Sequence, residues 1–386
     1  MSLDTSHTSL DIKTNEVLKP YTTFKIGGPA RFFATARNEE EIRQAFNFWQ
    51  LQNSNTGPAI SGTVGQFVLG GGSNILVSDN GFDGMVFHLT SKGLSVVSED
   101  DETVTISIAA GERWDDAVRY AVEHGWWGIE NLSHIPGQAG AAVVQNIGAY
   151  GQQISDVLHS AEVLDKRKGD RTHRLVAAAC GMGYRQSIFN SRMRNCYLIV
   201  GVTLKLAKHG KPSVDYPDVK AYFKARGIGR PSLSEIRQAI ITIRDMKFPF
   251  PKEEKGGNAG SFFKNLLLSK VEYEVLETNI RRHFGPHELH RLEGIKNRFP
   301  TPGQIKIPTA FLLEICGLKG CVEGGARVNE TQPLVLLNEG GATANDVLRL
   351  AKHIRQTIHR QTGMVIFLEP ELVGFSESEI AEFLVL

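Results

Sequence analysis

The amino-acid sequence predicts an α+β protein with more than one domain. Before residue 210, short apolar runs and segments that alternate apolar and polar residues are typical of β-strands. After residue 210, apolar residues recur at spacings of three and four, which is typical of helices. The chain has 386 residues, and a chain of this length is expected to divide into two or three domains.

In the first half, one helix and several strands are expected. Asn38 precedes three glutamates and an apolar face that contains Ile42 and Trp49, so a helix is predicted to begin there. Residues 2–15 are polar and are expected to fray, and residues 53–66 have the composition of an inserted loop. The predicted strands span residues 67–69, 75–77, 103–109, 157–165 and 197–206.

The second half is predicted to be richer in helices. Ser232 and Glu235 have the spacing of a capping box, so a helix should begin just after Ser232. The last long helix should end before Gly363, because glycine is favoured just beyond a helix C-terminus. The other predicted elements are helices at 270–284 and 344–361, a proline-containing domain linker at 248–251 and a strand at 364–368.

The composition argues against several classes of partner. Lysine and arginine number 43 against 42 acidic residues, whereas nucleic acids and anionic membranes select a basic excess. The four cysteines form no C-x-x-C pair and are predicted to be reduced thiols. No secretory signal precedes Lys19, and no apolar run approaches the roughly 18 residues that a membrane span needs. A cytoplasmic protein is therefore expected.

Three histidines have a spacing that could suit metal ligands. His283, His287 and His290 have spacings of four and three, which would place them on one face of a helix. Pro286 falls between them and is expected to break that helix. A solvated helix end and loop is therefore predicted, and no metal site.

Glycine is in excess, at 39 of 386 residues, or about 10% against an average near 7%. Three glycines lie in GGGSN at residues 70–74, where successive N–H groups could form a nest for phosphate oxygens. The flanking residues match neither a P-loop nor a dinucleotide-binding turn, so this segment alone is better interpreted as a tight turn between strands. Residues 134–151, rich in glycine and alanine, suit a cofactor contact and helix packing equally well. Together the two segments favour an extended cofactor lying across both.

Three further segments combine polar residues with apolar neighbours. They contain Arg185, the Ser261–Asn265 stretch and the Glu369-Pro370-Glu371 sequence. Taken singly, each is better interpreted as structural: a surface arginine, a helix N-cap and a charged strand end.

Taken in order along the chain, six short motifs resemble a known family. None is specific by itself, but their shared order argues against coincidence. The resemblance is to the UDP-N-acetylenolpyruvoylglucosamine reductases and extends from about Tyr21 to Val373. The motifs are GGGSN (70–74), IPG (135–137), QNIGAYG (145–151), GYRQSIF (183–189), NAGSFFKN (258–265) and LEPE (368–371).

The resemblance implies a two-part FAD-binding module of the vanillyl-alcohol-oxidase (PCMH) type, followed by an α+β substrate domain. The first FAD-binding part would span residues 1–78, joined by the C-terminal residues 371–386. The second would span 79–248, and the substrate domain 249–370. The residues implied to contact FAD are Gly70, Gly71, Gly72, Ser73, Asn74, Ile135, Pro136, Gly137, Gln145, Asn146, Gly148, Ala149 and Tyr150.

The resemblance also implies a reaction, in which NADPH reduces FAD and the enolpyruvyl group of a UDP-sugar then receives the hydride. Arg185 would stabilise the substrate carboxylate as negative charge develops beside it. Glu371, or Glu369 in its place, would help to hold that carboxylate. Ser261 would donate the proton that completes the reduction.

Four more residues are implied to bind or support the substrate. Tyr216 matches a tyrosine that closes over the UDP moiety, and Lys247 matches a lysine that meets the diphosphate. Lys264 and Asn265 would support Ser261 and the substrate. A monomer is expected.

Some positions depart from the family pattern. Val143 stands where many relatives have proline, and Gln138-Ala139 replaces a small β-branched pair. Two alternatives remain at this stage. One is a flavin oxidase of the same fold, against which the substrate-side motifs argue. The other is a nucleotide-sugar-binding regulator without redox activity, against which the intact flavin motifs argue.

Overall fold

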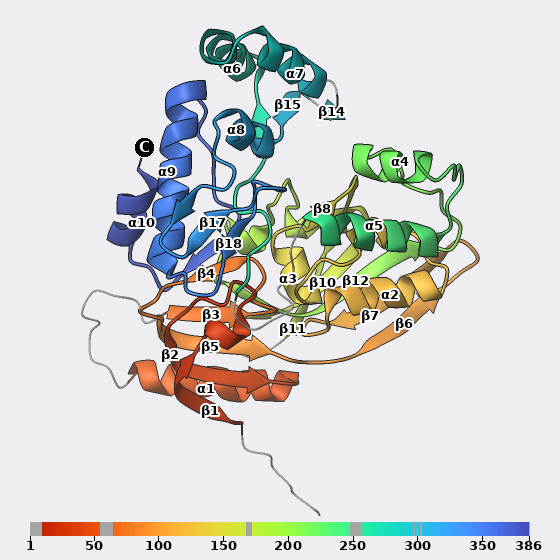
Figure 1. The fold of residues 1–386 in the computed structure, drawn as a ribbon. Coiled ribbons are helices and arrows are strands. Elements are labelled where there is room, and N and C mark those ends of the chain that lie inside the picture. The colour runs from red at the N-terminus through yellow and green to blue at the C-terminus, as the bar shows by residue number, and fades with distance from the viewer. Residues whose placement is uncertain are drawn as a thin grey trace, which may run out of the picture. The chain divides into compact units, whose positions relative to one another are not determined.

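The computed structural model describes residues 10–54, 65–166, 172–247, 256–296, 298, 300–301 and 303–385. The chain divides into two compact units (Figure 1). Unit 1 comprises Met1–Glu16, Ala30–Gly71 and Asp83–Met246, and unit 2 comprises Val17–Pro29, Gly72–Phe82 and Lys247–Leu386. Each unit is therefore assembled from segments that are distant in sequence.

Unit 1 contains a four-stranded sheet with the strand order β1-β2-β5-β3. Helix α1 (Glu39–Ser54) begins after Asn38, whose Oδ1 accepts the N–H of Glu41 at 2.9 Å, and it buries Trp49 in the core of unit 1. The expected fraying of residues 2–15 is wrong for its last residues, because Ile12 onwards forms an edge strand. The strands are β1 (Ile12–Val17), β2 (Pro29–Ala36), β3 (Gly65–Leu69) and β5 (Phe82–Leu89).

The second sheet of unit 1 has five antiparallel strands in the order β11-β10-β12-β7-β6. Strand β7 has the predicted bounds, and its alternation buries Val104, Ile106 and Ile108 while the polar residues between them stay half-exposed. Helices α2 (Trp114–Glu123) and α3 (Ala139–Val144) contribute to the same core. The strands are β6 (Leu94–Glu99), β7 (Thr103–Ala109), β10 (Leu158–Asp165), β11 (Thr172–Val176) and β12 (Tyr197–Ala207).

Two helices of unit 1 form a separate small core. Helix α5 (Leu233–Lys247) begins at the predicted capping box, since Glu235 N–H donates to Ser232 Oγ and Ser232 N–H donates to Glu235 Oε2. Helix α4 (Pro217–Lys224) lies on α5 (Figure 1). The residues buried in this small core are Tyr150, Val219, Phe223, Ile236, Ala239, Ile240 and Ile243.

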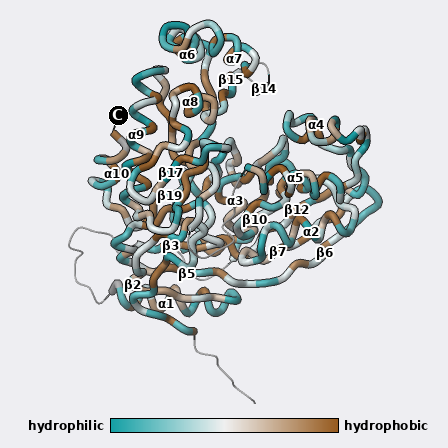
Figure 2. The backbone as a smooth tube through the Cα atoms, viewed as in Figure 1, coloured by the Kyte–Doolittle hydropathy of each residue, from teal (hydrophilic) through white to brown (hydrophobic). Residues whose placement is uncertain are grey.

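Unit 2 is organised around helix α9 (Ala344–Thr362). Thr343 caps its N-terminus and Gly363 ends it in the left-handed conformation, both close to the prediction. Hydrophobic and hydrophilic positions alternate along this helix (Figure 2), and its apolar face is buried in the core of unit 2. The other helices are α6 (Lys270–His283), α7 (Pro286–Lys296), α8 (Thr309–Ile315) and α10 (Glu377–Leu384).

The strands of unit 2 form small sheets. Strand β4 (Ile75–Val77) pairs in parallel with β19 (Glu371–Val373), which joins a segment near residue 75 to the C-terminal part of the chain. The other strands are β13 (Leu266–Leu268), β14 (Pro300–Thr301), β15 (Gln304–Ile307), β16 (Val322–Glu323), β17 (Ala326–Val328) and β18 (Leu336–Asn338). The remaining short elements of the chain are β8 (Gly148–Ala149), β9 (Gln152–Gln153) and 3₁₀ turns at Lys19–Tyr21, Glu130–Leu132, Ile154–Asp156, Ala177–Cys180 and Ile188–Asn190.

One prediction for unit 2 is wrong and another is right in part. The predicted strand Met364–Leu368 does not form, since only Leu368 makes a bridge, to Phe263. The carbonyl of Ile366 accepts Arg355 Nε at 3.1 Å.

The predicted helix break at Pro286 is confirmed, because α6 ends at His283 and Pro286 is the first residue of a separate helix, α7. The loop expected there is wrong for His287 and His290, which lie on α7.

The expected three-domain division stays a prediction. The two compact units differ from it in number and in their N-terminal boundaries, and the predicted linker at 248–251 lies outside the described residues. All four cysteines are free thiols, as predicted. Among the helices of the described residues, none is long and apolar enough to cross a membrane.

Candidate active site

The two glycine-rich segments of the sequence lie against each other within unit 1. A Cβ atom added to Gly71 would lie 2.7 Å from Gly137 Cα, closer than Cβ atoms approach other atoms in real structures. Gly70 similarly faces Ala141. Glycine at position 71 is therefore required by a close approach of two backbones.

The GGGSN segment is not a hairpin turn. Strand β3, which precedes it, pairs with β5, whereas β4, which follows it, pairs with β19. Outside the strand ladders, the N–H groups of Gly70, Gly71 and Gly72 donate to no backbone carbonyl of the residues that the structure describes. Successive peptide N–H groups in such a loop can bind an anionic ligand.

The middle of the 134–151 segment is a helix that packs closely. Residues 139–144 form α3, and a Cβ added to Gly140 would lie 2.8 Å from Ala110 Cβ. The helix-packing interpretation therefore holds for these residues, while the flanking motifs at 135–137 and 145–151 are turns and short strands. The implied flavin contacts in those flanks are half-buried at Ile135, Pro136, Gly137, Gln145, Gly148 and Ala149.

Arg185 lies against the 145–151 motif, and both belong to unit 1. Its Nη2 donates to the carbonyl of Gly148 at 2.7 Å, and its Nη1 donates to that of Asn146 at 3.5 Å. Asn146 Nδ2 in turn donates to the carbonyl of Gly183 at 2.8 Å. The structure thus brings together two motifs that the sequence only placed in order.

The backbone around this contact is conformationally strained. Arg185, Asn146 and Tyr150 all have positive φ angles, of 52°, 47° and 48°. Non-glycine residues adopt this region rarely, and their clustering is a mark of functional segments.

In unit 2, Ser261 is held half-exposed beside two buried aromatic residues. Phe262 and Phe263 are 1% and 0% exposed, and their rings contact each other edge to face. The N–H of Phe262 donates to the carbonyl of Leu334 at 2.7 Å, and Ser261 bridges Val335. The position of Ser261 is therefore set by a packed core and by backbone pairing.

Lys264 and Asn265 follow directly and are half-buried. The N–H of Lys264 donates to the carbonyl of Phe367 at 2.9 Å, and the carbonyl of Lys264 accepts the hydroxyl of Thr309 at 2.6 Å. Asn265 Oδ1 accepts the N–H of Thr309, the first residue of α8. Asn265 therefore has a structural contact that the sequence did not indicate.

Glu369 and Glu371 lie beside Asn74 in unit 2. Asn74 Nδ2 donates to the carbonyl of Glu369 at 3.3 Å, and Asn74 O accepts the N–H of Glu371 at 3.0 Å. Both glutamates are half-buried. The end of the GGGSN segment and the LEPE motif are thus neighbours within one unit.

Tyr216 is the residue that precedes α4, and its ring meets that of Tyr150 edge to face at 5.3 Å. Tyr150, which is implied as a flavin contact, buries its ring in the small core of α4 and α5. Burial raises the pKa of Tyr150 to about 12, so its hydroxyl is protonated at neutral pH. Lys247 is the last residue of α5, and its carbonyl accepts Asn329 Nδ2 at 3.5 Å.

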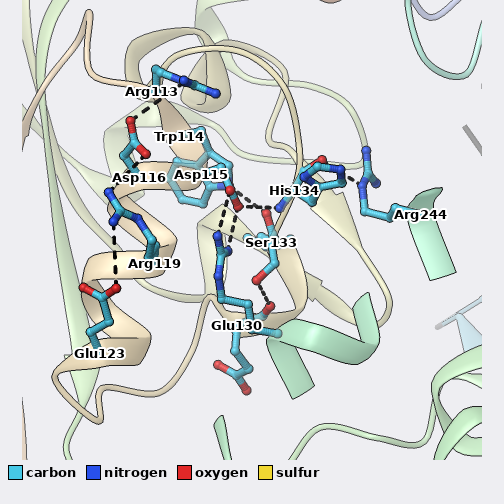
Figure 3. A network of polar contacts seen from close by, with 12 residues as sticks. Arg113, Trp114, Asp115, Asp116, Arg119, Glu123, Glu130, Ser133, His134 and Arg244 are labelled. Carbon is cyan, nitrogen blue, oxygen red and sulfur yellow. Dashed lines mark hydrogen bonds and ion pairs between the residues drawn. The ribbon is translucent and has the colours of Figure 1, made fainter. Parts of the chain in front are cut away.

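A polar network next to Tyr150 was missed by the sequence analysis (Figure 3). Arg244 donates from Nε to the carbonyl of His134 at 2.9 Å and forms a hydrogen bond with the hydroxyl of Tyr150. His134 Nε2 lies 2.9 Å from Asp245 Oδ1. The sequence contained a signal for this network, because the Arg244-Asp245 pair lies at the polar edge of a predicted amphipathic helix.

Asp115 of α2 completes this network. It accepts both Nη atoms of Arg237 from α5, at 2.7 and 2.8 Å, and the N–H of His134. Burial alone would raise the pKa of Asp115, but the hydrogen bonds from Arg237 and His134 lower it overall. Within the described part of the chain, no group of His, Cys, Asp and Glu side chains could hold a metal ion.

Comparisons with known proteins agree on one family. A model of the C-terminal domain of UDP-N-acetylenolpyruvoylglucosamine reductase matches residues 251–373, and a model of an FAD binding domain matches residues 61–173. The fold is similar to the crystal structure of UDP-N-acetylenolpyruvylglucosamine reductase from Thermus caldophilus, with a TM-score of 0.59 and 24% identity over 95% of this chain and 99% of that one. The predicted fold class, an FAD-binding module of the PCMH type followed by an α+β substrate domain, is confirmed.

Curated relatives extend the match to nearly the whole chain. The UDP-N-acetylenolpyruvoylglucosamine reductase of Flavobacterium johnsoniae is 34% identical over 94% of this chain and 100% of its own length. That of Neisseria gonorrhoeae is 37% identical over 94% of this chain and 97% of its own. On this identity and coverage, the chain belongs to the UDP-N-acetylenolpyruvoylglucosamine reductase family of FAD-dependent oxidoreductases.

Proposed function

We propose that the protein reduces the enolpyruvyl group of UDP-N-acetylglucosamine enolpyruvate to a lactyl ether, with NADPH as the reductant. The product would be UDP-N-acetylmuramate, a precursor of peptidoglycan made in the cytoplasm, and the enzyme would act as a monomer. The observation that carries the proposal is the contact of Arg185 with the carbonyls of Asn146 and Gly148. It joins the residue proposed for the substrate carboxylate to a segment proposed for the flavin.

The residues present fit FAD. The successive peptide N–H groups at Gly70–Gly72 suit its diphosphate, and the bare backbone at Gly71 and Gly137 suits a close approach. When bound, FAD supplies the hydride of the reaction. The other residues proposed to hold it are Ser73, Asn74, Ile135, Pro136, Gln145, Asn146, Gly148, Ala149 and Tyr150.

Arg185 is proposed to bind the substrate carboxylate and to stabilise the charge that builds up next to it. Its guanidinium is permanently charged and offers donors in a planar fork. Two of these donors are already engaged by backbone carbonyls, so the fork is held in one orientation before a ligand arrives. A preorganised cation lowers a barrier more than one that must reorient.

Ser261 is proposed to donate the proton that completes the reduction. Its backbone is held by the neighbouring buried Phe262 and by the bridge to Val335, so the point from which its side chain projects is fixed. Lys264 and Asn265 are proposed to assist substrate binding there. Glu371 is proposed to share the substrate carboxylate, with Glu369 as the alternative.

Tyr216 and Lys247 are proposed to contact the UDP moiety. A tyrosine offers a flat apolar ring and a hydroxyl donor, and a lysine offers a charge for the diphosphate. Tyr216 owes its place to α4, whose small core with α5 supports it.

The test is a pair of half-reactions on the purified holoprotein. NADPH is expected to bleach the visible absorbance band of the oxidised flavin, and the enolpyruvyl substrate is expected to restore it under anaerobic conditions. A protein that takes up no FAD would contradict the enzyme function. A protein that NADPH bleaches but the enolpyruvyl substrate does not recolour would instead indicate a flavin enzyme with another substrate.

A further inference from the structure

Helix α5 is attached to the rest of unit 1 by two arginines that flank its apolar face. Arg237 and Arg244 are two helical turns apart, so they project in nearly the same direction. Both are largely buried, and each reaches a different partner (Figure 3 shows the part of this network around Arg244). Arg237 pairs with another helix, whereas Arg244 contacts a residue next to the proposed substrate site.

Arg237 makes a structural contact. Its guanidinium forms a two-pronged ion pair with Asp115 of α2, at 2.7 and 2.8 Å. This pair joins one helix to another and involves no residue that is proposed to meet FAD or substrate. Arg237 therefore serves as an internal reference for a purely structural arginine.

Arg244 contacts a different kind of residue. It is 8% exposed, and a buried charge is tolerated only when hydrogen bonds satisfy it. Those bonds run to the carbonyl of His134 and to the hydroxyl of Tyr150. Tyr150 then contacts Tyr216 ring against ring, at 5.3 Å and an interplanar angle of 82°.

The hydrogen bond leaves Tyr150 in one defined state. Its hydroxyl stays protonated at neutral pH, because burial raises its pKa to about 12. The guanidinium therefore donates to the phenol oxygen, and the ring is fixed at both ends, by this bond and by the packing of Tyr150 in the small core.

We propose that Arg244 is a positioning residue for the UDP-sugar, acting through Tyr150 to hold Tyr216 where it reaches the substrate. This inference rests on the proposed function, since it assigns Tyr216 to the UDP moiety. It assigns a role to a residue that is proposed to touch neither FAD nor substrate. Arg244 acts through Tyr150 and Tyr216, which together are called the tyrosine relay.

The experiment uses four variants of the holoprotein: R244Q, R244K, Y150F and the matched control R237Q. Binding of the enolpyruvyl UDP-sugar to the oxidised enzyme is measured by calorimetry without NADPH, alongside KM, kcat and the melting temperature. Losing a hydrogen bond to a charged group should raise Kd and KM roughly 10-fold in Y150F and R244Q, and kcat should change less than about 2-fold in R244Q. R244K should recover part of the loss.

The control separates positioning from stability. R237Q is expected to lower the melting temperature while leaving Kd unchanged, because Arg237 bonds to Asp115 and not to either tyrosine of the relay. The double variant R244Q/Y150F should bind no more weakly than R244Q alone, because both remove the same bond. If R244Q does not fold, Y150F decides the question.

Two results would overturn the inference. One is an unchanged Kd in Y150F, and the other is an equal weakening of binding in R237Q and R244Q. A failure of the proposed function looks different, because the wild-type holoprotein itself would then neither bind nor reduce the enolpyruvyl substrate.

Discussion

The loop that carries Ser261 and the helix that follows Tyr216 are supported in different ways. Ser261 stands next to Phe262 and Phe263, which are part of the large core of unit 2 together with the apolar face of α9. Tyr216 precedes α4, which rests on α5 through a small core that includes Val219 and Phe223. A proton donor needs a fixed position, whereas an element that meets an entering substrate can be held by fewer contacts.

This difference predicts whether a mutation should lower global stability or weaken substrate binding. Damage to the core of unit 2 should lower global stability and leave little folded enzyme to assay. Damage to the α4–α5 core should weaken substrate binding first, since a small satellite core can loosen without exposing the main one. The following predictions test that contrast, from the largest expected effect to the smallest.

Ser261→Ala should slow the reoxidation of reduced flavin by the enolpyruvyl substrate by about 10²–10⁴-fold, because the proton donor is lost. Flavin reduction by NADPH needs no such proton and should be nearly unchanged. Stopped-flow absorbance measures the two half-reactions separately. Ser269→Ala is the control, because Ser269 caps α6 and its loss should cost about 1 kcal/mol of stability without affecting either rate. Equal slowing of both half-reactions in Ser261→Ala would make Ser261 structural.

Leu350→Ala should destabilise the fold by about 2–5 kcal/mol, because Leu350 is 1% exposed in the core of unit 2 and its truncation leaves a cavity. Chemical denaturation monitored by circular dichroism gives this free energy of unfolding. The variant that remains folded should bind the UDP-sugar with the wild-type Kd. If Leu350→Ala weakened binding without lowering stability, the predicted difference between the two cores would be wrong.

Phe223→Ala should show the opposite pattern. Phe223 is 3% exposed between α4 and α5, so its removal should loosen the support of Tyr216. We expect KM for the UDP-sugar to rise several-fold, with a smaller loss of global stability than in Leu350→Ala. Hydrogen exchange over residues 216–224 should increase while that of α9 stays unchanged. Exchange that increases in both helices would mean that they belong to one cooperative unit.

Asp115→Asn should remove about 1–3 kcal/mol of stability at pH 7, because the carboxylate accepts a two-pronged ion pair and a backbone N–H. The pKa of Asp115 is lowered in the folded state, so its contribution is present above the unfolded value near 3.9 and is lost as the pH falls through the folded value. The stabilities of wild type and variant should therefore begin to converge as the pH falls below about 4.

The neighbouring Asp116 provides the control for that experiment. Asp116 is exposed on the same helix and pairs with Arg119 at 3.4 Å. Surface pairs of this kind contribute little, so Asp116→Asn should change stability by less than about 1 kcal/mol at any pH. A gap between wild type and Asp115→Asn that stays constant down to pH 3 would contradict the assigned role of its charge.

Much of the local structure could be predicted from the sequence. Strand Thr103–Ala109 follows from strict alternation, and the start of α5 follows from the Ser232–Glu235 capping box, because both depend on neighbours in sequence. The predicted strand at 364–368 failed because this apolar run meets a partner segment only where Leu368 bridges Phe263, a contact between distant parts of the sequence. The helix break at Pro286 was predicted correctly, but the sequence did not show that a second helix begins at that proline.

The candidate site was predicted unevenly. Motif order singled out Arg185, Ser261 and Glu371, but no periodic pattern showed which backbone groups would hold them. Asn265 and Tyr150 have structural contacts that the motifs did not indicate, to Thr309 and to Arg244. The roles of all these residues stay predictions until the half-reactions are measured.

The sequence by itself determined the family and the main helices and strands, since these depend on residue types, motif order and short-range preferences. Only the tertiary structure decided that Gly71 meets Gly137, that Arg185 is fixed by the carbonyl of Gly148, and that Arg244 reaches Tyr150. The physical reason is that each of these contacts joins segments far apart in sequence. Their geometry is set by how the cores pack rather than by local preference.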